Sequence, residues 1–127
     1  MSKEEAHQRL EKTRLPDPQE EAQKIRAIFG PIADELIPAQ KDLIDMTGTQ
    51  FKALKARIVD HWQEVHAIAA SVPPAEDFTR WLHMLGGPVD GGEVGLSVEE
   101  VRLAKDYSHY LRKRFSINKL RLLLGIS

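Results

Sequence analysis

The sequence predicts an all-α protein, an orthogonal bundle of about five to seven helices without a sheet. Apolar residues recur at spacings of three and four residues over several stretches, which is the period of a helix face. No stretch alternates apolar and polar residues with period two for long enough to predict a strand. Capping boxes and breaks at Gly and Pro separate the apolar stretches, and these signals mark helix starts and ends.

The size and composition favour one helical domain with an arm. The chain has 127 residues, of which 42% are hydrophobic and 29% are charged. These values are ordinary for a globular domain that can form a core. We expect a polar N-terminal helical arm over residues 1–17 and a helical domain over residues 18–127.

Charge and composition exclude several classes of function. The net charge is −1 and the isoelectric point is about 6.5, so no overall positive field attracts nucleic acid or an anionic membrane. The absence of cysteine excludes disulfides, cysteine-ligated zinc and iron–sulfur clusters. The charged N-terminal segment is not typical of a signal peptide, and no apolar run approaches the roughly 20 residues of a membrane span. We therefore expect a cytoplasmic protein with no membrane partner.

The predicted arm is a short polar helix. Ser2 and Glu5 form a capping box that opens a helix to about Arg14. Ala6 and Leu10 give this helix only a thin apolar stripe. We expect it to fray or to lean on a neighbouring helix.

The next segment predicts a helix followed by a kinked stretch. Asp17 is a good N-cap and Pro18 suits the first helical position, so a second helix runs from here to Gly30. Pro38 lies inside the apolar stretch 31–46. Since proline lacks a backbone donor and crowds the preceding turn, this stretch should kink or divide into two short helices.

The clearest predicted element is one continuous helix over about residues 50–70. Its apolar residues recur at steps of three and four, as expected for the spine of a core. They are Phe51, Leu54, Ile58, Trp62, Val65 and Ala69.

Three further helices are predicted after it. The first follows Pro74 and has an apolar face of Phe78, Trp81, Leu82 and Leu85. A glycine-rich loop leads to Ser97, which forms a capping box with Glu100 and opens a helix to about Arg114. Ser116 can cap a last short helix that Gly125 ends.

The search for catalytic or metal-binding residues gives little. Among the five histidines, His61 and His66 are five residues apart, which does not place two ligands on one helix face. His61 and Glu64 have a permitted spacing, but they are only two ligands, and a solvated helix surface is the favoured interpretation. Ser108 and His109 are adjacent, so they point about 100° apart on a helix and do not form a catalytic pair. The sequence contains no nucleophile elbow, P-loop or dinucleotide-binding motif.

A basic cluster near the C-terminus has two interpretations. It contains Arg112, Lys113, Arg114, Lys119 and Arg121, with no acidic residue among them. The favoured interpretation is a solvated face with cations near a helix C-terminus. The alternative is a site for an anion or a partner, for which we select Tyr107, His109, Arg112 and Arg114. The segment SINKLRLLLGIS has the cadence of the first helix and turn of a helix-turn-helix, but no recognition helix follows, so nucleic-acid binding is disfavoured.

Three stretches of the second half of the chain follow one another in a recognisable order. They are FKALKARIVDHWQEV, VPPAEDFTRWLHMLGGP and VGLSVEEVRLAKDYSHYLRKRFSINKLRLLLGI. Taken in this order, they resemble the C-terminal helical region of the sn-glycerol-1-phosphate dehydrogenase family, and the resemblance covers about residues 18–126. That family is grouped with iron-containing alcohol dehydrogenases, glycerol dehydrogenases and dehydroquinate synthase.

The resemblance implies a role without catalysis in this chain. Enzymes of that family bind NAD(P) in an N-terminal half with a glycine-rich phosphate loop, and an Asp and two His hold a divalent metal before the helical region. No catalytic, cofactor-binding or metal residue can therefore be carried over to this sequence. The resemblance implies instead that certain large side chains are packing residues, namely Phe51, Trp62, Phe78, Trp81 and Leu111.

Two classes of function remain, with a weaker third. The first is a helical module that lacks the nucleotide-binding half and metal ligands, is not catalytic by itself, and has that half or a full-length subunit as its partner. Exposed apolar surface would favour it. The second is a free-standing helical binding or oligomerisation protein, which a stable homo-oligomer would favour. The third is a small DNA-binding protein.

Overall fold

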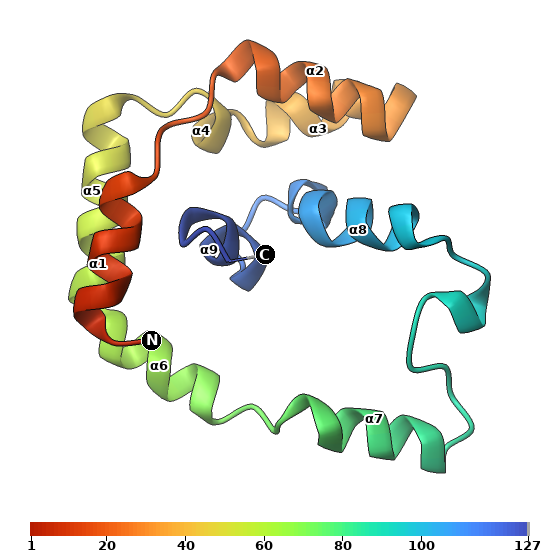
Figure 1. Cartoon of the computed structure of the whole chain (residues 1–127). Helices are drawn as coiled ribbons and strands as arrows, with labels where there is room; N and C mark the ends of the chain where they lie inside the picture. The colour runs from red at the N-terminus through yellow and green to blue at the C-terminus, as the bar shows by residue number, and fades with distance from the viewer. Residues whose placement is uncertain (127) are drawn as a thin grey trace.

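The computed structural model describes residues 1–126, and all regular elements in this range are helices (Figure 1). This confirms the predicted all-α class. In chain order the α-helices are α1 (Lys3–Lys12), α2 (Pro18–Phe29), α3 (Ala33–Ala39), α4 (Lys41–Ile44), α5 (Gly48–Asp60), α6 (Trp62–Ala70), α7 (Ala75–Met84), α8 (Val98–Tyr107) and α9 (Ile117–Leu123). Short 3₁₀ turns cover Gly30–Ile32, Gly92–Val94 and Ser108–Leu111.

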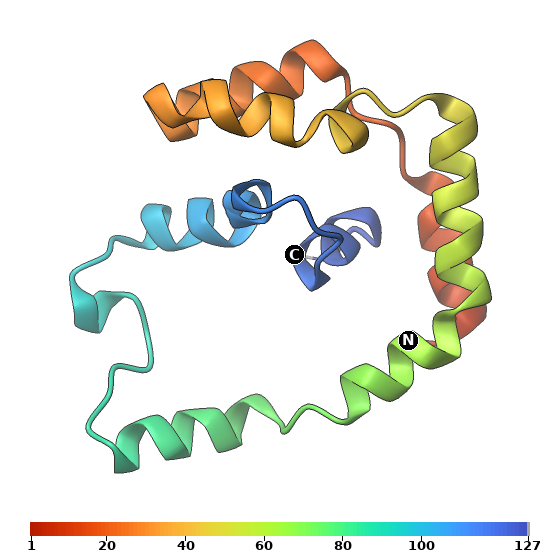
Figure 2. The same ribbon diagram turned by 180° about the vertical axis from the view of Figure 1, so that it is seen from behind.

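The helices form an open arc around α8 and α9 (Figures 1 and 2). Helix α1 lies along α5, and α2 packs against α3. Helices α8 and α9 lie inside the arc, whereas α7 stands apart at its open end. The buried residues form two separate clusters. One cluster includes α9, and the other includes the turn after α8.

The first buried cluster fixes the N-terminal arm. It joins α1, α5, α6 and α9 through Ala6, Leu10, Ile58, Trp62, Leu120 and Leu124. Ser2 caps α1, because its Oγ accepts a hydrogen bond from the Glu5 N–H at 3.1 Å, but the Glu5 carboxylate contacts Arg9 and does not complete the predicted capping box. Lys55 Nζ also donates to the Leu10 carbonyl at 3.0 Å. Of the two expected outcomes for the arm, fraying or leaning on a neighbour, the structure has the second.

The second buried cluster holds α2, α3 and α4 against the turn after α8. Its members are Ile25, Ala33, Leu36, Ile44 and Tyr110. Asp17 caps α2 as predicted, since Oδ1 accepts hydrogen bonds from the next two free backbone N–H groups. Pro38 lies in α3, and the chain divides at Gln40 into the two short helices that the sequence predicts.

The predicted continuous helix over residues 50–70 is wrong at one point. His61 adopts φ −95° and ψ 17°, which ends α5 and starts α6. The next residue, Trp62, is buried against α1 and α9, and its indole N–H donates to the Met1 carbonyl at 3.3 Å. Apolar periodicity does not detect this single non-helical residue. Beyond the break, Ile68 and Ala69 are exposed, so the spine of the core is shorter than expected.

Two other predicted helix ends are also wrong. Helix α1 ends at Lys12 and not at Arg14, because Thr13 is extended and its hydroxyl donates to the Leu123 carbonyl of α9 at 2.5 Å. Helix α8 ends at Tyr107 and continues only as a 3₁₀ turn. There the carbonyl of Tyr110 accepts a hydrogen bond from the Gln40 side chain at 2.8 Å. Long-range contacts therefore set both ends.

Only part of the predicted packing is confirmed. Phe51 and Trp62 are buried, but Phe78, Trp81 and Leu111 are exposed. Helix α7 has no buried residue, because it stands away from both clusters and no other described helix covers its apolar face.

We predict that the contact between α1 and α5 contributes a large share of the stability. Leu10 is fully buried, so Leu10→Ala should lower the free energy of unfolding by about 2–5 kcal/mol through lost transfer energy and a residual cavity. Urea unfolding followed by circular dichroism measures this. Leu85→Ala is the matched control: Leu85 is 83% exposed, so the change should stay within about 0.5 kcal/mol. Equal effects would contradict the packing described for α1.

Candidate functional site

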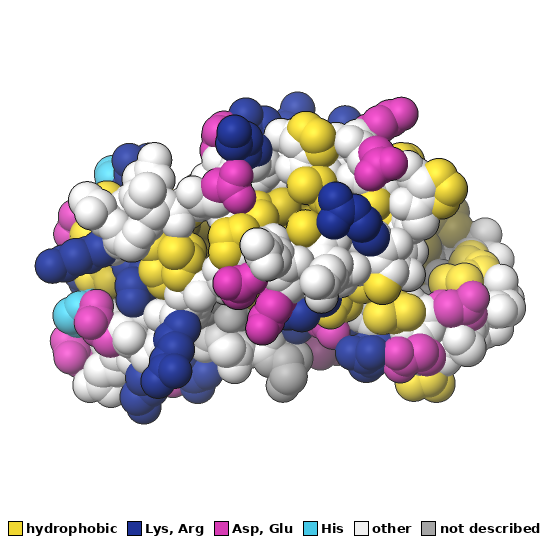
Figure 3. Space-filling view, turned by 90° about the horizontal axis from the view of Figure 1, so that it is seen from above, with side chains coloured by type: hydrophobic (Ala, Val, Ile, Leu, Met, Phe, Trp, Pro, Cys, Tyr) yellow, Lys and Arg dark blue, Asp and Glu magenta, His cyan; other side chains and the backbone are white. Residues whose placement is uncertain are grey.

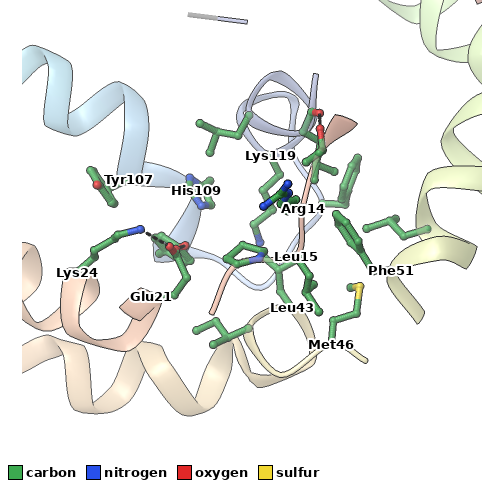
Figure 4. A pocket seen from close by; sticks show the side chains of 18 of the residues that line it. Arg14, Leu15, Glu21, Lys24, Leu43, Met46, Phe51, Tyr107, His109 and Lys119 are labelled. Carbon is green, nitrogen blue, oxygen red and sulfur yellow. Dashed lines mark hydrogen bonds and ion pairs between the residues drawn. The ribbon is translucent and has the colours of Figure 1, made fainter. Parts of the chain in front are cut away.

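A cavity of about 360 Å³ lies between α2, α4, α5, α9 and the turn after α8 (Figure 4). Its size falls at the lower end of the range for small-molecule sites. One part of its wall is apolar and includes Leu43, Met46 and Phe51. The other part carries ionisable side chains, namely Arg14, Glu21, Lys24, Asp106, Tyr107, His109, Tyr110 and Lys119.

A chain of polar contacts from α2 forms one side of the cavity. The Tyr110 hydroxyl donates a hydrogen bond to Glu21 Oε2, and Lys24 Nζ donates to Glu21 Oε1 at 2.7 Å. Burial raises the pKa of Tyr110, and the bond to Glu21 raises it further. The bond to Glu21 also raises the pKa of Lys24. Glu21 is therefore a carboxylate whose charge is already balanced by neighbouring donors.

His109 is the second polar group and is held neutral. Its side chain is 9% exposed, and its Nδ1 has no hydrogen-bond partner among the described residues. Burial lowers its pKa to about 4, and the positive charge of Lys119 adds to this effect. Its ring lies against Tyr110, with 4.0 Å between the ring centroids. A buried nitrogen without a hydrogen-bond partner is unusual in a folded protein.

Lys119 is the third polar group of the cavity wall, and its side chain is a buried cation. It is 6% exposed, and Nζ donates to Gln40 Oε1 at 3.1 Å. No carboxylate of residues 1–126 lies within ion-pair distance of this ammonium group. Burial lowers the pKa of Lys119. The cavity thus contains a cation that a neutral amide, and not an acid, stabilises.

The structure brings together two of the four residues selected from the sequence. Tyr107 and His109 line the cavity, with Tyr107 half-buried. Arg112 is exposed outside it, and Arg114 lines a separate hollow of about 160 Å³. The predicted role of these four residues in contact with an anion or a partner stays a prediction.

Two of the five residues of the basic cluster form ion pairs with acidic residues outside it. Lys113 Nζ lies 2.6 Å from Asp42 Oδ2, and Arg121 Nη2 lies 2.9 Å from Asp106 Oδ1. On the face seen in Figure 3, Lys and Arg side chains alternate with Asp and Glu side chains, and hydrophobic side chains reach the surface between them. This mixed charge does not resemble the one-sided basic surface of a nucleic-acid-binding protein.

Sequence reasoning missed Glu21, Gln40 and the role of Lys119 in the cavity. Gln40 carried one available signal, because it lies three or four residues from Leu36, Ile37, Leu43 and Ile44 and therefore falls on their apolar face. Glu21 carried none, since an acidic residue in the first turns of a helix is ordinary.

No metal-binding group is found in the described part of the chain. No set of three or more His, Cys, Asp or Glu side chains is placed to hold an ion in residues 1–126. His61 Nδ1 lies 3.0 Å from Glu64 Oε1, but both side chains are exposed. Within the same range, none of the helices is both long enough and apolar enough to cross a membrane.

Comparison with known proteins gives one partial match. The chain is 32% identical over 68 residues to the glycerol-1-phosphate dehydrogenase [NAD(P)+] of Bacillus licheniformis. The match covers 50% of this chain and 17% of that protein, so the chain spans only a small part of its length. No protein-family model and no solved structure matches the chain. The match supports a distant relation to glycerol-1-phosphate dehydrogenase.

We predict that His109 makes the protein sensitive to acid. The pKa of His109 is about 4 in the folded protein, below the ordinary value of 6.5. As the pH falls below 6.5, the unfolded chain takes up a proton that the folded protein does not bind. Stability should therefore fall by about 3 kcal/mol between pH 6.5 and 4, and no further below that.

The measurement is urea unfolding of the wild type and His109→Gln at several pH values in this window. The free-energy difference between them should change with pH as stated, because other titrating groups cancel in the comparison. The control is His66→Gln, which changes an exposed histidine of α6 and should give a curve parallel to the wild type. A parallel curve for His109→Gln would show that His109 is not held neutral.

Proposed function

We propose that this chain is a helical module of a glycerol-1-phosphate dehydrogenase-like protein and corresponds to its C-terminal helical region. In this proposal the apolar face of α7 packs against the remainder of the enzyme, and the module is not catalytic by itself. The exposed face of α7 carries the proposal. The partial match to the Bacillus enzyme supports it.

The apolar face of α7 has the pattern of a buried helix. Its four large side chains, Phe78, Trp81, Leu82 and Leu85, occupy positions i, i+3, i+4 and i+7. This spacing forms a single stripe that faces a core in most globular proteins. The rings of Phe78 and Trp81 pack edge to face at 5.3 Å, yet Trp81 is 42% exposed. Such a contiguous stripe favours a partner surface over solvent.

The total accessible surface area also supports a partner protein. The accessible surface is 9213 Å², whereas a compact monomer of 14.4 kDa has about 6,800 Å². The excess is about three times the roughly 800 Å² that each partner contributes to an interface of standard size. The open arc therefore has enough uncovered surface to join a larger protein.

The residues present do not fit NAD(P) or a catalytic metal. The glycine-rich segment Gly86–Gly95 connects α7 to α8, whereas a phosphate loop follows a strand. The described residues also form no metal-binding cluster. In the proposal, both groups are bound by the remainder of the enzyme, and no step of the reaction is assigned to this chain.

A free-standing binding protein is the alternative that one observation favours. The cavity between α2 and α9 is large enough for a small ligand and does not involve α7. Binding of nucleic acid has less support, because Asp42 and Asp106 pair with Lys113 and Arg121 of the basic cluster.

The mass of the native polypeptide separates the two proposals. An antibody against this chain, used on cells that express the gene from its own locus, should detect a polypeptide about three times heavier than 14.4 kDa. That result is expected if the chain is a module of a dehydrogenase. A single band at 14.4 kDa would reject the module and favour the free-standing protein.

We also predict that Trp81 is buried in the native, longer protein. Trp81→Glu should lower its thermal stability and reduce the NAD(P)+-dependent oxidation of sn-glycerol-1-phosphate at least tenfold, because a charge would be buried in an apolar contact. Ile32→Glu is the control, since Ile32 is similarly exposed but lies between α2 and α3, far from α7. If the two variants behave alike, the face of α7 is not the interface.

A further inference from the structure

The wall of the cavity beside Lys119 has a polar part and an apolar part. Figure 4 places Lys119, His109 and Arg14 around its middle, with Leu43, Met46 and Phe51 beyond them. Its volume of about 360 Å³ lies within the range of small-molecule sites. A ligand of this size with one charged end and one apolar end would match the wall on both sides.

Two cations on the cavity wall, Arg14 and Lys119, form no ion pair with any residue of 1–126. The ionised groups are three cations, Arg14, Lys24 and Lys119, and two carboxylates, Glu21 and Asp106. Both carboxylates are already engaged. Glu21 accepts hydrogen bonds from Lys24 and Tyr110, and Asp106 forms ion pairs with Arg102 and Arg121.

Lys119 is the group that most needs an anion. It is buried, and within residues 1–126 the amide oxygen of Gln40 is the only hydrogen-bond acceptor of its ammonium group. A buried charge without an opposite charge is costly, and an anion brought by a ligand would lower that cost. Arg14 also lines the cavity and is exposed, so it can attract an anion from solvent.

His109 lines the same cavity as Lys119. Among the described residues, its buried Nδ1 has no hydrogen-bond partner. The charged or titratable groups that influence it or line the same wall are Arg14, Glu21, Lys24, Asp106, Tyr107, Tyr110, Lys119 and Arg121. A negative charge next to Lys119 would offset its repulsion of a proton on His109.

We propose that this cavity binds a small amphipathic monoanion, a carboxylate with an apolar body of about six to ten carbon atoms. The carboxylate accepts a hydrogen bond from Lys119, and the apolar body lies against Leu43, Met46 and Phe51. The site uses no residue of α7, so it is independent of the proposed role as a dehydrogenase module.

Three probes test the two ends of the site separately by isothermal titration calorimetry. Octanoate has both ends, octan-1-ol has only the apolar body, and inorganic phosphate has only the charge. Octanoate should bind at one saturable site, at least tenfold more tightly than either of the others. Absent binding of octanoate, or equal binding of octan-1-ol or phosphate, would overturn the proposal.

Lys119→Met tests the cation with little change in side-chain length. It should weaken octanoate binding at least tenfold and leave octan-1-ol binding unchanged, since only the charge is removed. Lys113→Met is the matched control, because Lys113 is an exposed lysine paired with Asp42, and it should bind octanoate like the wild type. Circular dichroism and thermal unfolding show whether each variant is folded. Unweakened binding of octanoate by folded Lys119→Met would overturn the proposal.

A measurement on the wild type covers the case in which Lys119→Met does not fold. The ring proton signals of His109, followed by NMR across pH, should give a pKa that rises from about 4 when octanoate is bound. Octan-1-ol should not raise it, and the signals of His66 on the exposed face of α6 should not respond to either probe. A pKa of His109 that is the same with and without octanoate would overturn the proposal.

Discussion

The structure depends on a buried amide, the side chain of Gln40, that joins three separate parts of the chain. Gln40 Nε2 donates to the carbonyl of Tyr110, and Gln40 Oε1 accepts from Lys119. Both partners lie at least 70 residues further along the chain. Because both ends of this buried amide are satisfied, the break between α3 and α4 holds the turn after α8 and the start of α9 in place. Tyr110 extends the connection to α2 through Glu21.

This polar network also explains why a cavity exists in so small a protein. Apolar side chains at these positions would close together and fill the space, as they do in the two buried clusters. Here Lys119 is directed toward Gln40, and Tyr110 toward Glu21. Their hydrogen bonds fix the side chains along the wall, so the helices α2 and α9 remain apart.

Features that depend on near neighbours could be predicted from the sequence, and features that depend on distant ones could not. The caps at Ser2, Asp17 and Ser97 involve residues two or three positions away, and the structure confirms each of them. The break at His61 and the early end of α8 depend on contacts with Met1 and Gln40, which no local pattern encodes. Periodicity likewise indicated an apolar face on α7 but not what covers it.

The same distinction applies to the site. Tyr107 and His109 could be selected because they precede a visible basic cluster, whereas Glu21 is 89 residues from the Tyr110 that it contacts. The cluster itself did not indicate the cavity, since Lys113 and Arg121 pair with acids and the buried Lys119 is its member at the cavity.

The cavity and the face of α7 are built from different helices. An anion bound at Lys119 would stabilise α2, α9 and the turn between α8 and α9, and would leave α7 as exposed as before. A role in a larger enzyme and a ligand in this cavity are therefore separate properties of one chain, each to be judged on its own contacts.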